Sequence, residues 1–309
     1  MSAHARHRCR RSGGPRSAAF LCGLVLFSGL AARSTHSAEP GAGAKRVVSL
    51  APSVTETIFA VGGGDRLVAV STYCDHPPEA AELPRAGSYL QPSVETIVGL
   101  EPDVVIGVPT PGNRAAVEHL RRLGIEVVVV SEDTLADTWE AMRTVGRVLG
   151  RPDRAEALVT SVQGEIAAVR AAAAGKPRRR VLFVVGHDPL VVAGEGLFLD
   201  ELIEAVGGRN VGALDRGMWP RLSLETVVAA APEVIIDGAM GTEASPEREK
   251  SLRRWWETYR SVPAVRDGHV RAQRSNALLR PGPRLGEAAR ELFELVHGDG
   301  GTEGETEGS

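Results

Sequence analysis

The chain contains little cysteine and few aromatic residues. It has three cysteines, Cys9, Cys22 and Cys74, and Phe, Trp and Tyr together make up 4% of its 309 residues. Cys9 and Cys22 lie in an N-terminal segment that we expect to be removed, so the mature chain keeps one thiol and cannot form an internal disulfide. Its stability must come from hydrophobic cores, for which 43% apolar residues are sufficient.

The chain also lacks the motifs of common enzymes and metal sites. No G-x-G-x-x-G follows the first expected strand, and neither G-x-x-x-x-G-K-[ST] nor G-x-S-x-G occurs. No pair of His or Cys residues has metal-ligand spacing, and the adjacent residues Cys74-Asp75-His76 indicate a structural loop rather than a metal site. The net charge of −3 gives no electrostatic reason to expect nucleic acid. An exported α/β enzyme is therefore the weaker alternative to a binding protein.

A sequence repeat is the most informative feature that is present. Residues 93–106 read S-V-E-T-I-V-G-L-E-P-D-V-V-I and residues 223–236 read S-L-E-T-V-V-A-A-A-P-E-V-I-I, with half of the fourteen positions identical. The tetrapeptide A-V-G-G also occurs twice, at 60–63 and at 205–208. A unit that recurs once, with long α/β segments between its copies, predicts two similar lobes with a cleft between them.

Each copy of the repeat predicts a short helix followed by a buried strand. Ser93 and Ser223 stand at helix N-cap positions, and Glu95 and Glu225 follow in the first turn, near the positive end of the helix dipole. The helix must end before the proline of the repeat, and the apolar run that follows is typical of a strand buried on both faces. The two glutamates either support their helices alone or place two carboxylates symmetrically on the two lobes.

The remaining pattern predicts an α/β protein with two similar lobes, at residues 46–150 and 180–297, each with a central, mostly parallel sheet. Ser53 is expected to cap the first helix. The expected strands are residues 46–50, 67–70, 104–107 and 127–130 in the first lobe and 181–185 and 234–237 in the second. Further helices are expected at residues 199–206 and 286–297.

The segment between the lobes predicts one long rigid helix. Residues 152–174 begin with proline, are rich in alanine and end before a Gly-Lys-Pro sequence. A helix of about 23 residues would span about 35 Å. We assign residues 151–175 to this connection, which would resist a large hinge closure.

The two ends of the chain lie outside the expected fold. Residues 1–38 combine a basic start with an apolar run at 18–32 that is too short to span a membrane comfortably, which predicts a signal peptide and a periplasmic product. Phe20-Leu21 is a poor lipoprotein processing sequence, so we do not expect a lipid anchor at Cys22. Residues 298–309 are rich in Gly, Glu and Thr and predict a disordered tail.

At this point the chain resembles a known family, the substrate-binding proteins of bacterial ABC importers for vitamin B12, ferric siderophores and haem. The resemblance covers residues 46–295 and is carried by R-V-V-S-L-A-P-S-V-T-E at 46–56 and by W-E-T-Y-R-S-V-P-A-V-R-D-G-H-V at 256–270. Within the family, the B12-binding members are most similar. Three further segments carry that similarity: Tyr73-Cys74-Asp75-His76-Pro77-Pro78, Trp219-Pro220, and the late loop with Ser275-Asn276, Arg280 and Pro283-Arg284.

The resemblance implies a role for seven residues. Tyr73, Tyr89 and Trp219 match positions where aromatic rings lie against the corrin, and Asn276 and Arg280 match polar positions on the far rim of the site. Glu95 and Glu225 match the lobe-tip glutamates that engage arginines on the two permease subunits. The implied ligand is cobalamin, another corrinoid or a metal chelate. The implied partner is an ABC permease dimer, through which alone the protein would contact the membrane, and neither a cofactor nor a protein-bound metal is expected.

Four positions depart from the pattern of B12 binders, so the identity of the ligand stays open. Val108, Val191 and Ala277 stand where B12 binders have aromatic residues, and Asn276 stands where the family pattern has aspartate. The loss of three aromatic side chains would weaken the binding of a flat macrocycle by stacking. A haem or ferric siderophore protein therefore remains the alternative within the family, and a ligand-sensing protein would differ only in not using the two glutamates for docking.

Several residues also have a purely structural interpretation. Tyr89 could brace the helix that follows it, and Arg280 could be an ordinary surface charge. Trp255 and Trp256 are expected to pack the last crossover of the second lobe. His187 follows a strand, where it either faces the cleft or caps the next turn.

Overall fold

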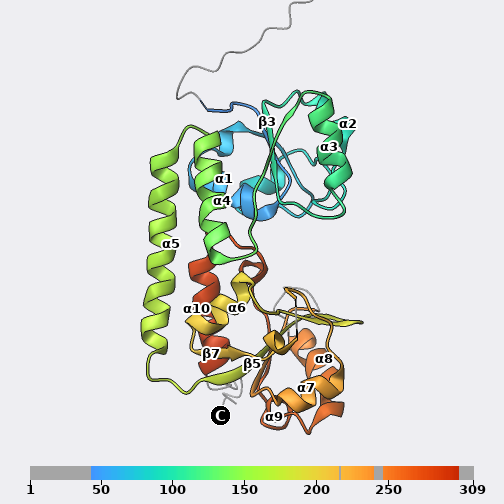
Figure 1. The fold of residues 1–309 in the computed structure, drawn as a ribbon, viewed down its shortest axis with the longest axis vertical. Helices are drawn as coiled ribbons and strands as arrows, with labels where there is room; N and C mark the ends of the chain where they lie inside the picture. Colours follow the sequence, from blue (N-terminus) through green and yellow to red (C-terminus); the bar gives the residue numbers. More distant parts are fainter. Residues whose placement is uncertain (1–42, 216, 240–245, 299–309) are drawn as a thin grey trace, which may run out of the picture. The chain divides into compact units, whose positions relative to one another are not determined.

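The computed structural model describes residues 43–215, 217–239 and 246–298 of the chain (Figure 1). The expected signal peptide and residues 299–309 of the expected tail lie outside these ranges. Two β-sheets with their surrounding helices form a first and a second lobe. Within the described ranges, no helix combines the length and the apolar character needed to cross a membrane. The prediction of two α/β lobes with mostly parallel sheets is confirmed.

The sheet of the first lobe has the strand order β2-β1-β3-β4, and all its pairings are parallel. Val104 and Ile106 of β3 face a hydrophobic cluster with α1 and α4, whereas Val105 faces a second cluster with α2 and α3. Helices on both faces explain why this strand is apolar throughout. The elements are β1 (Val47–Ser49), α1 (Pro52–Ala60), β2 (Leu67–Val70), α2 (Val94–Gly99), β3 (Val104–Gly107), α3 (Arg114–Arg122), β4 (Glu126–Val129) and α4 (Leu135–Val148).

The sheet of the second lobe repeats this arrangement with additions. Its order is β6-β5-β8-β9, with β7 also paired to β5, and only the β5–β6 pairing is antiparallel. In β8, Val234 and Ile236 face one cluster and Ile235 faces another, which reproduces β3 130 residues later. The elements are β5 (Arg179–His187), β6 (Leu190–Val192), α6 (Phe198–Ala205), β7 (Gly208–Asn210), α7 (Leu224–Ala230), β8 (Val234–Asp237), α8 (Pro246–Trp256), α9 (Pro263–Arg266), β9 (Val270–Ala272) and α10 (Leu285–His297).

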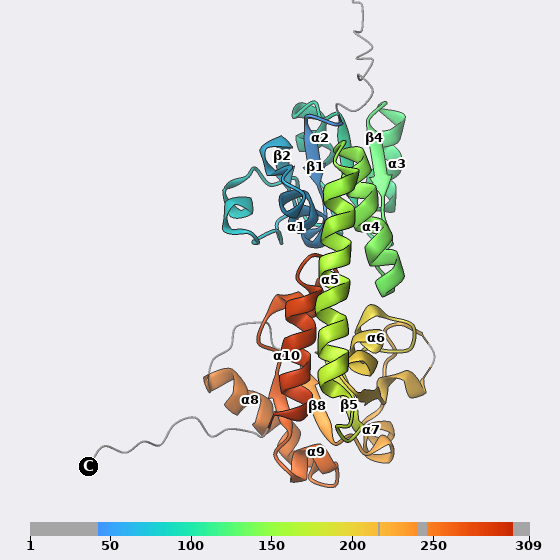
Figure 2. The same ribbon diagram turned by 90° about the vertical axis from the view of Figure 1, so that its left-hand side faces the viewer.

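The long helix between the lobes is α5 (Pro152–Ala173), with 22 residues. It packs beside α4 and α10, as Figures 1 and 2 both show. One hydrophobic cluster joins Met142 of α4, Val162 of α5 and Leu292 of α10. The start of α4 also meets the second lobe directly, because the Phe198 N–H donates to the Asp133 carbonyl at 2.7 Å. The two lobes therefore share hydrophobic core as well as a connecting helix.

The repeat is visible in the backbone as well as in the sequence. Ser93 and Ser223 are the N-caps of α2 and α7, and their hydroxyls accept hydrogen bonds from the N–H groups of Thr96 and Thr226 at 3.3 and 3.2 Å. The residues before the two repeat prolines, 101 and 231, both have a φ of 47°. Gly62 and Gly207 of the two A-V-G-G segments both have a φ of 77°, which favours glycine. The predicted cap, helix and strand of each copy are confirmed.

The predicted cap of the first helix is wrong. Helix α1 begins at Pro52 and its N-cap is Ala51, which makes no side-chain capping bond. Proline at the first helical position loses no hydrogen bond, because that N–H has no partner inside the helix. Ser53 lies inside the helix instead, where it is buried and its hydroxyl donates to the Glu132 carboxylate at 2.6 Å.

Three short strands were not predicted from the sequence. β6, β7 and β9 have three residues each. Such segments are too short to show a periodic pattern, and β7 contains Gly, Arg and Asn, which are not typical strand residues. They form because β5 and β8 offer free edges to pair with.

Candidate functional site

Two exposed tyrosines lie side by side on the first lobe. The ring centroids of Tyr73 and Tyr89 are 5.6 Å apart, with an angle of 63° between the ring planes. Their exposed fractions are 53% and 37%, which is high for aromatic residues. Both belong to the segment between β2 and α2, which follows the carboxyl end of a sheet strand. An edge-to-face pair of this kind presents apolar surface in a defined geometry.

The backbone that carries these tyrosines is firmly anchored. Next to Tyr73, Cys74 is buried and its sulfur accepts a hydrogen bond from the Thr55 hydroxyl at 3.1 Å. The Arg85 guanidinium donates to the Cys74 carbonyl at 2.8 Å. The buried Asn113 side chain donates to the Tyr89 carbonyl at 2.9 Å. Cys74 is thus a structural loop residue, as predicted, and the two rings are exposed on a fixed frame.

A polar cluster next to Tyr73 joins the two lobes. We define the polar cluster as Glu56 and Asp75 of the first lobe with Asn276, Arg280 and Arg284 of the second. Arg284 donates to both carboxylate oxygens of Glu56, at 2.9 and 2.7 Å, and to the Asn276 side-chain oxygen at 2.8 Å. Arg280 donates to both carboxylate oxygens of Asp75. The contacts with Glu56 and Asp75 connect positions that are more than two hundred residues apart in the sequence.

Burial makes the Glu56–Arg284 part of the polar cluster a strong constraint, whereas the Asp75 side chain is 57% exposed. The Glu56 side chain is 2% exposed, and the side chains of Arg280 and Arg284 are 14% and 12% exposed. The hydrogen bond from Arg280 holds the pKa of Asp75 below its ordinary value, against the opposing effect of burial. Burial disfavours the charge of Arg284, yet its hydrogen bonds and attraction to Glu56 raise its pKa above the ordinary value. Two carboxylates and two guanidinium groups balance each other here.

The structure therefore gives Arg280 partners within the protein. Besides Asp75, its guanidinium donates to the Tyr73 carbonyl at 3.1 Å and approaches Glu56 at 3.5 Å. Asn276 approaches Asp75 at 3.4 Å. Tyr73, Tyr89, Asn276 and Arg280 thus form one connected set, but the ligand contact expected of Arg280 and Asn276 stays a prediction.

Trp219 lies on the second lobe, in a segment beside the edge strand β6. The Gly194 N–H donates to the Met218 carbonyl at 2.8 Å, and the Val192 N–H donates to the Pro220 carbonyl at 3.1 Å. The Trp219 side chain is 44% exposed and Met218 beside it is 41% exposed. Among the described residues, no other ring stacks on Trp219, and no contact joins it to the two tyrosines.

The three positions that depart from the aromatic pattern have different surroundings. Ala277 is fully buried in the core that the lobes share, so its methyl group cannot reach a bound molecule. Val108 packs against the core of the first lobe, and its carbonyl accepts a hydrogen bond from Asn113. Val191 is half-buried and forms an isolated β-bridge with Arg221, two residues after Trp219.

A cavity of about 320 Å³ adjoins the polar cluster, with residues of both lobes in its wall. Glu56 and His76 line it from the first lobe, and Pro283 and Arg284 line it from the second. Its volume is at the lower end of the range of small-molecule sites, which extends from about 300 to 1,000 Å³.

The two repeat glutamates are exposed on the first turns of α2 and α7. The hydroxyl of Ser223 donates to Glu225 and lowers the pKa of that carboxyl, so the group is ionised at neutral pH. Val98 and Val228, three residues after the glutamates, are 39% and 38% exposed. Each lobe therefore presents the same pair of side chains, one acidic and one apolar.

The family follows from comparison with known proteins. Residues 47–277 match the model of the periplasmic binding protein family. The chain belongs to this family. Its sequence is 30% identical to the vitamin B12-binding protein of Pectobacterium carotovorum over 250 residues, which cover 80% of this chain and 87% of that protein. It is also 30% identical to the vitamin B12-binding protein of Salmonella typhimurium over 253 residues, 82% of this chain and 90% of that protein.

Solved structures of the family have the same fold. The periplasmic vitamin B12 binding protein of Vibrio cholerae superposes with a TM-score of 0.71 at 27% identity, covering 82% of this chain and 97% of that one. The periplasmic heme-binding protein of Roseiflexus sp. RS-1 superposes with a TM-score of 0.72 at 31% identity, covering 82% and 100%. The same periplasmic binding fold thus occurs in proteins named for two different ligands.

Sequence reasoning missed a buried network in the second lobe. His187 at the end of β5 bonds the Asp237 carboxylate at 2.7 Å, and the Trp256 indole N–H donates to the same carboxylate at 2.9 Å. The His187 ring stacks on Trp255, with centroids 4.1 Å apart. Trp256 is fully buried, so its predicted packing role is confirmed. His187 neither caps a turn nor stands free, because its partner comes from β8, fifty residues away.

Glu132 is a second missed residue, at the point where the first lobe meets the start of α4. It is half-buried, and burial raises its pKa to about 8, although the hydrogen bond from Ser53 opposes the shift. Repulsion from Glu56 and Asp133 raises it further. Glu132 consequently keeps its proton to a higher pH than an ordinary glutamate.

Removing Arg284, one partner of the buried ion pair, should show how much the polar cluster contributes to stability. We expect Arg284→Met to lower the free energy of unfolding by about 3 kcal/mol, because it leaves Glu56 buried without its bidentate partner. Urea denaturation measures the change. Arg290→Met is the matched control: the exposed pair of Arg290 with Glu165 should contribute less than about 1 kcal/mol. If the two variants lost the same free energy of unfolding, the special role of the Glu56–Arg284 pair would be contradicted.

The raised pKa of Glu132 predicts a specific pH dependence. Between the ordinary pKa of 4.5 and the folded value of about 8, the folded state binds the proton more tightly, so stability falls as the pH rises through this window. Between pH 5 and pH 8, we expect the free energy of unfolding of Glu132→Gln to fall by about 1–3 kcal/mol less than that of the parent protein. Each unit of pKa shift corresponds to about 1.4 kcal/mol. Urea denaturation from pH 5 to pH 8 measures it, and parallel curves for the two proteins would refute the prediction.

Proposed function

We propose that the chain is the periplasmic substrate-binding protein of an ABC importer and that it captures vitamin B12 or a related corrinoid. The observation that carries the proposal is the pair of exposed tyrosines on an anchored loop beside the polar cluster. The relatives named vitamin B12-binding protein support the choice of ligand. Every relative described above is named as a binding protein, which supports a role without catalysis.

In this proposal the corrinoid binds between the lobes. Tyr73 and Tyr89 provide an apolar platform on the first lobe, and Trp219 provides a second one on the other lobe. Asn276 and Arg280 supply polar contacts at the rim, where the polar cluster already holds their side chains in place. The shared core and the polar cluster fix the lobes before the ligand arrives. Binding therefore loses little conformational entropy of the protein.

A haem or ferric siderophore ligand is the alternative. The observation that favours it is the loss of three aromatic positions at Val108, Val191 and Ala277, of which Ala277 is fully buried. The similarity to a heme-binding protein at 31% identity supports the same alternative. The importer role is unchanged in this case.

The two lobe tips are proposed to dock on the two subunits of an ABC permease. Glu95 and Glu225 would each pair with a cation of one subunit, and the exposed Val98 and Val228 would add an apolar contact at each point. Their equivalent places in the repeat match a partner with twofold symmetry. This role requires export, which we assign to the signal peptide at residues 1–38. We expect no lipid anchor at Cys22.

Calorimetric titration of residues 39–309 with cyanocobalamin tests the ligand. We expect saturable one-to-one binding that weakens about tenfold in Tyr73→Ala and in Trp219→Ala, since an aromatic contact contributes about 0.5–1.5 kcal/mol beyond the area it buries. Leu123→Ala is the control, because it removes another exposed apolar side chain at the opposite end of α3 from Asn113, the residue that contacts Tyr89. Binding of haem or a ferric siderophore with no binding of cyanocobalamin would select the alternative.

A charge reversal tests the docking of the lobe tips. We expect Glu95→Lys/Glu225→Lys to abolish uptake by cells while the dissociation constant for ligand changes less than about twofold, because the two charges act only on the permease. Uptake assays and titration measure the two effects. Glu118→Lys/Glu204→Lys is the control, with one equally exposed glutamate on each lobe. Normal uptake by the lobe-tip variant would overturn the docking proposal.

A further inference from the structure

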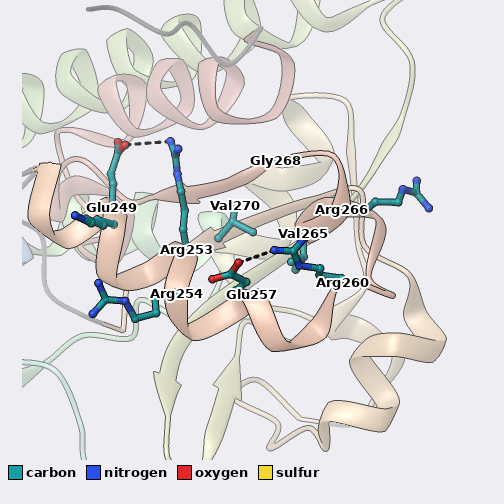
Figure 3. Close-up of a pocket in the computed structure, with 10 residues that line it drawn as sticks. Glu249, Arg253, Arg254, Glu257, Arg260, Val265, Arg266, Gly268 and Val270 are labelled. Atoms are coloured by element: carbon teal, nitrogen blue, oxygen red, sulfur yellow. Dashed lines mark hydrogen bonds and ion pairs between the residues drawn. The ribbon is translucent and has the colours of Figure 1, made fainter.

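A basic groove lies on the second lobe, on the face formed by α8, η4 (Glu257–Tyr259), α9 and β9 (Figure 3). Its volume is about 700 Å³. Five cationic side chains line it: Lys250, Arg253, Arg254, Arg260 and Arg266. No residue of the proposed ligand site or of the lobe tips lines this groove, so the proposed function does not account for it.

The neighbouring carboxylates balance these cations only in part. Arg266 pairs with Asp267 at 2.8 Å. Glu249 pairs with Arg253 at 3.4 Å and Glu257 pairs with Arg260 at 2.5 Å, as the dashed lines in Figure 3 show. Lys250 and Arg254 pair with no carboxylate in the part of the chain that the structure describes. In a protein with a net charge of −3, the groove is therefore a local region of positive potential that favours an anionic occupant.

Arginine side chains continue from the groove toward the end of α10, where Arg274 pairs with Glu294 at 3.2 Å. Arg271 of β9 is half-buried, and burial together with the like charges of Arg253, Arg179 and Arg274 lowers its pKa. The Arg271 guanidinium approaches the carbonyl of Gly298 at 3.5 Å. Gly298 directly follows α10 and is the last residue that the structure describes. The chain thus leaves the described fold at the margin of the basic surface.

The sequence that follows has the complementary charge. Residues 299–309 read D-G-G-T-E-G-E-T-E-G-S and contain four carboxylates, Asp299, Glu303, Glu305 and Glu307, without Lys or Arg. From Gly298, the seven residues to Glu305 can span at most about 25 Å. A short tether of this kind gives a local concentration on the order of millimolar, which favours an intramolecular occupant over a free anion.

We propose that the acidic segment 303–307 of this chain binds the basic groove of its own second lobe. Its three glutamates meet the cations that lack a carboxylate partner, Lys250 and Arg254, and the partly paired Arg253. The contact is electrostatic and depends on salt, since exposed charges are screened within about 10 Å at 0.1 M ionic strength. While the segment is bound, the groove is closed to other polyanions.

Distances between two spin labels test the contact directly. The labels are placed at Thr306→Cys in the segment and at Ser251→Cys on α8, in the protein of residues 39–309; Cys74 is 1% exposed and stays unlabelled. We expect one narrow distance at about 10 mM salt and a broad distribution at about 1 M, where the screening length falls from about 30 to about 3 Å. A broad distribution at low salt, or a narrow one that salt leaves unchanged, would overturn the proposal.

Charge variants identify the groove as the binding surface. Lys250→Glu/Arg254→Glu should broaden the distribution at low salt, whereas Arg122→Glu/Arg170→Glu, the same charge change at exposed positions elsewhere, should not. Equal effects of the two pairs would count against the groove. A short distance in an equimolar mixture of singly labelled chains would show binding between copies and contradict the intramolecular contact.

Retention on heparin gives an independent readout. If the segment covers the groove, Glu303→Gln/Glu305→Gln/Glu307→Gln should raise the elution salt more when it is combined with Arg122→Glu/Arg170→Glu than with Lys250→Glu/Arg254→Glu, two backgrounds of equal net charge. Elution at the same salt with and without the three glutamates would overturn the proposal.

Discussion

The bidentate ion pair between Glu56 and Arg284 is the contact on which the arrangement of the lobes depends. It joins α1 of the first lobe to the residue before α10 of the second, and Arg280, Asp75 and Asn276 extend it to the loop that carries Tyr73. A buried pair of this kind contributes little net stability compared with apolar residues, but it strongly penalises any arrangement in which one partner is lost. It therefore selects one relative position of the lobes, and the core shared by α4, α5 and α10 supports that position.

This arrangement places the residues proposed to bind ligand and those proposed to dock on the permease on different parts of each lobe. The inner part of each lobe, near the carboxyl ends of its first strands, carries the aromatic and polar side chains. The tips carry the repeat glutamates on the first turns of α2 and α7. Because both glutamates follow from one repeated unit, the cap, the helix and the buried strand that place Glu95 also place Glu225. Under the proposed function, the two docking points are fixed by the repeated unit and do not depend on the residues between the lobes.

The sequence predicted local features well where one residue type has one physical role. Ser93 and Ser223 cap their helices as expected, and the apolar runs of β3 and β8 are buried on both faces. The cap at Ser53 was wrong because Pro52 can itself occupy the first helical position, which leaves the serine free to bond Glu132. The short strands β6, β7 and β9 form by pairing with the edges of β5 and β8. The three residues of each short strand do not indicate that such an edge is available.

The candidate site was predictable only in part, for a related reason. Exposed tyrosines in a loop can be recognised from the sequence, and resemblance pointed to Tyr73, Tyr89 and Trp219. The partners of a charged residue cannot be recognised, because they lie far away in the chain: Arg280 meets Asp75 at a separation of 205 residues and Arg284 meets Glu56 at 228. Arg280, which the resemblance gave as a ligand contact, thus also belongs to the joint between the lobes, and its ligand contact stays a prediction.

The most direct test of the account is a crystal structure grown with cyanocobalamin and measured at the cobalt absorption edge. We expect one anomalous peak per chain between the Tyr73–Tyr89 pair and Trp219, with the Glu56–Arg284 pair intact. A cobalt peak elsewhere on the protein, or the ligand in place with that ion pair broken, would contradict it.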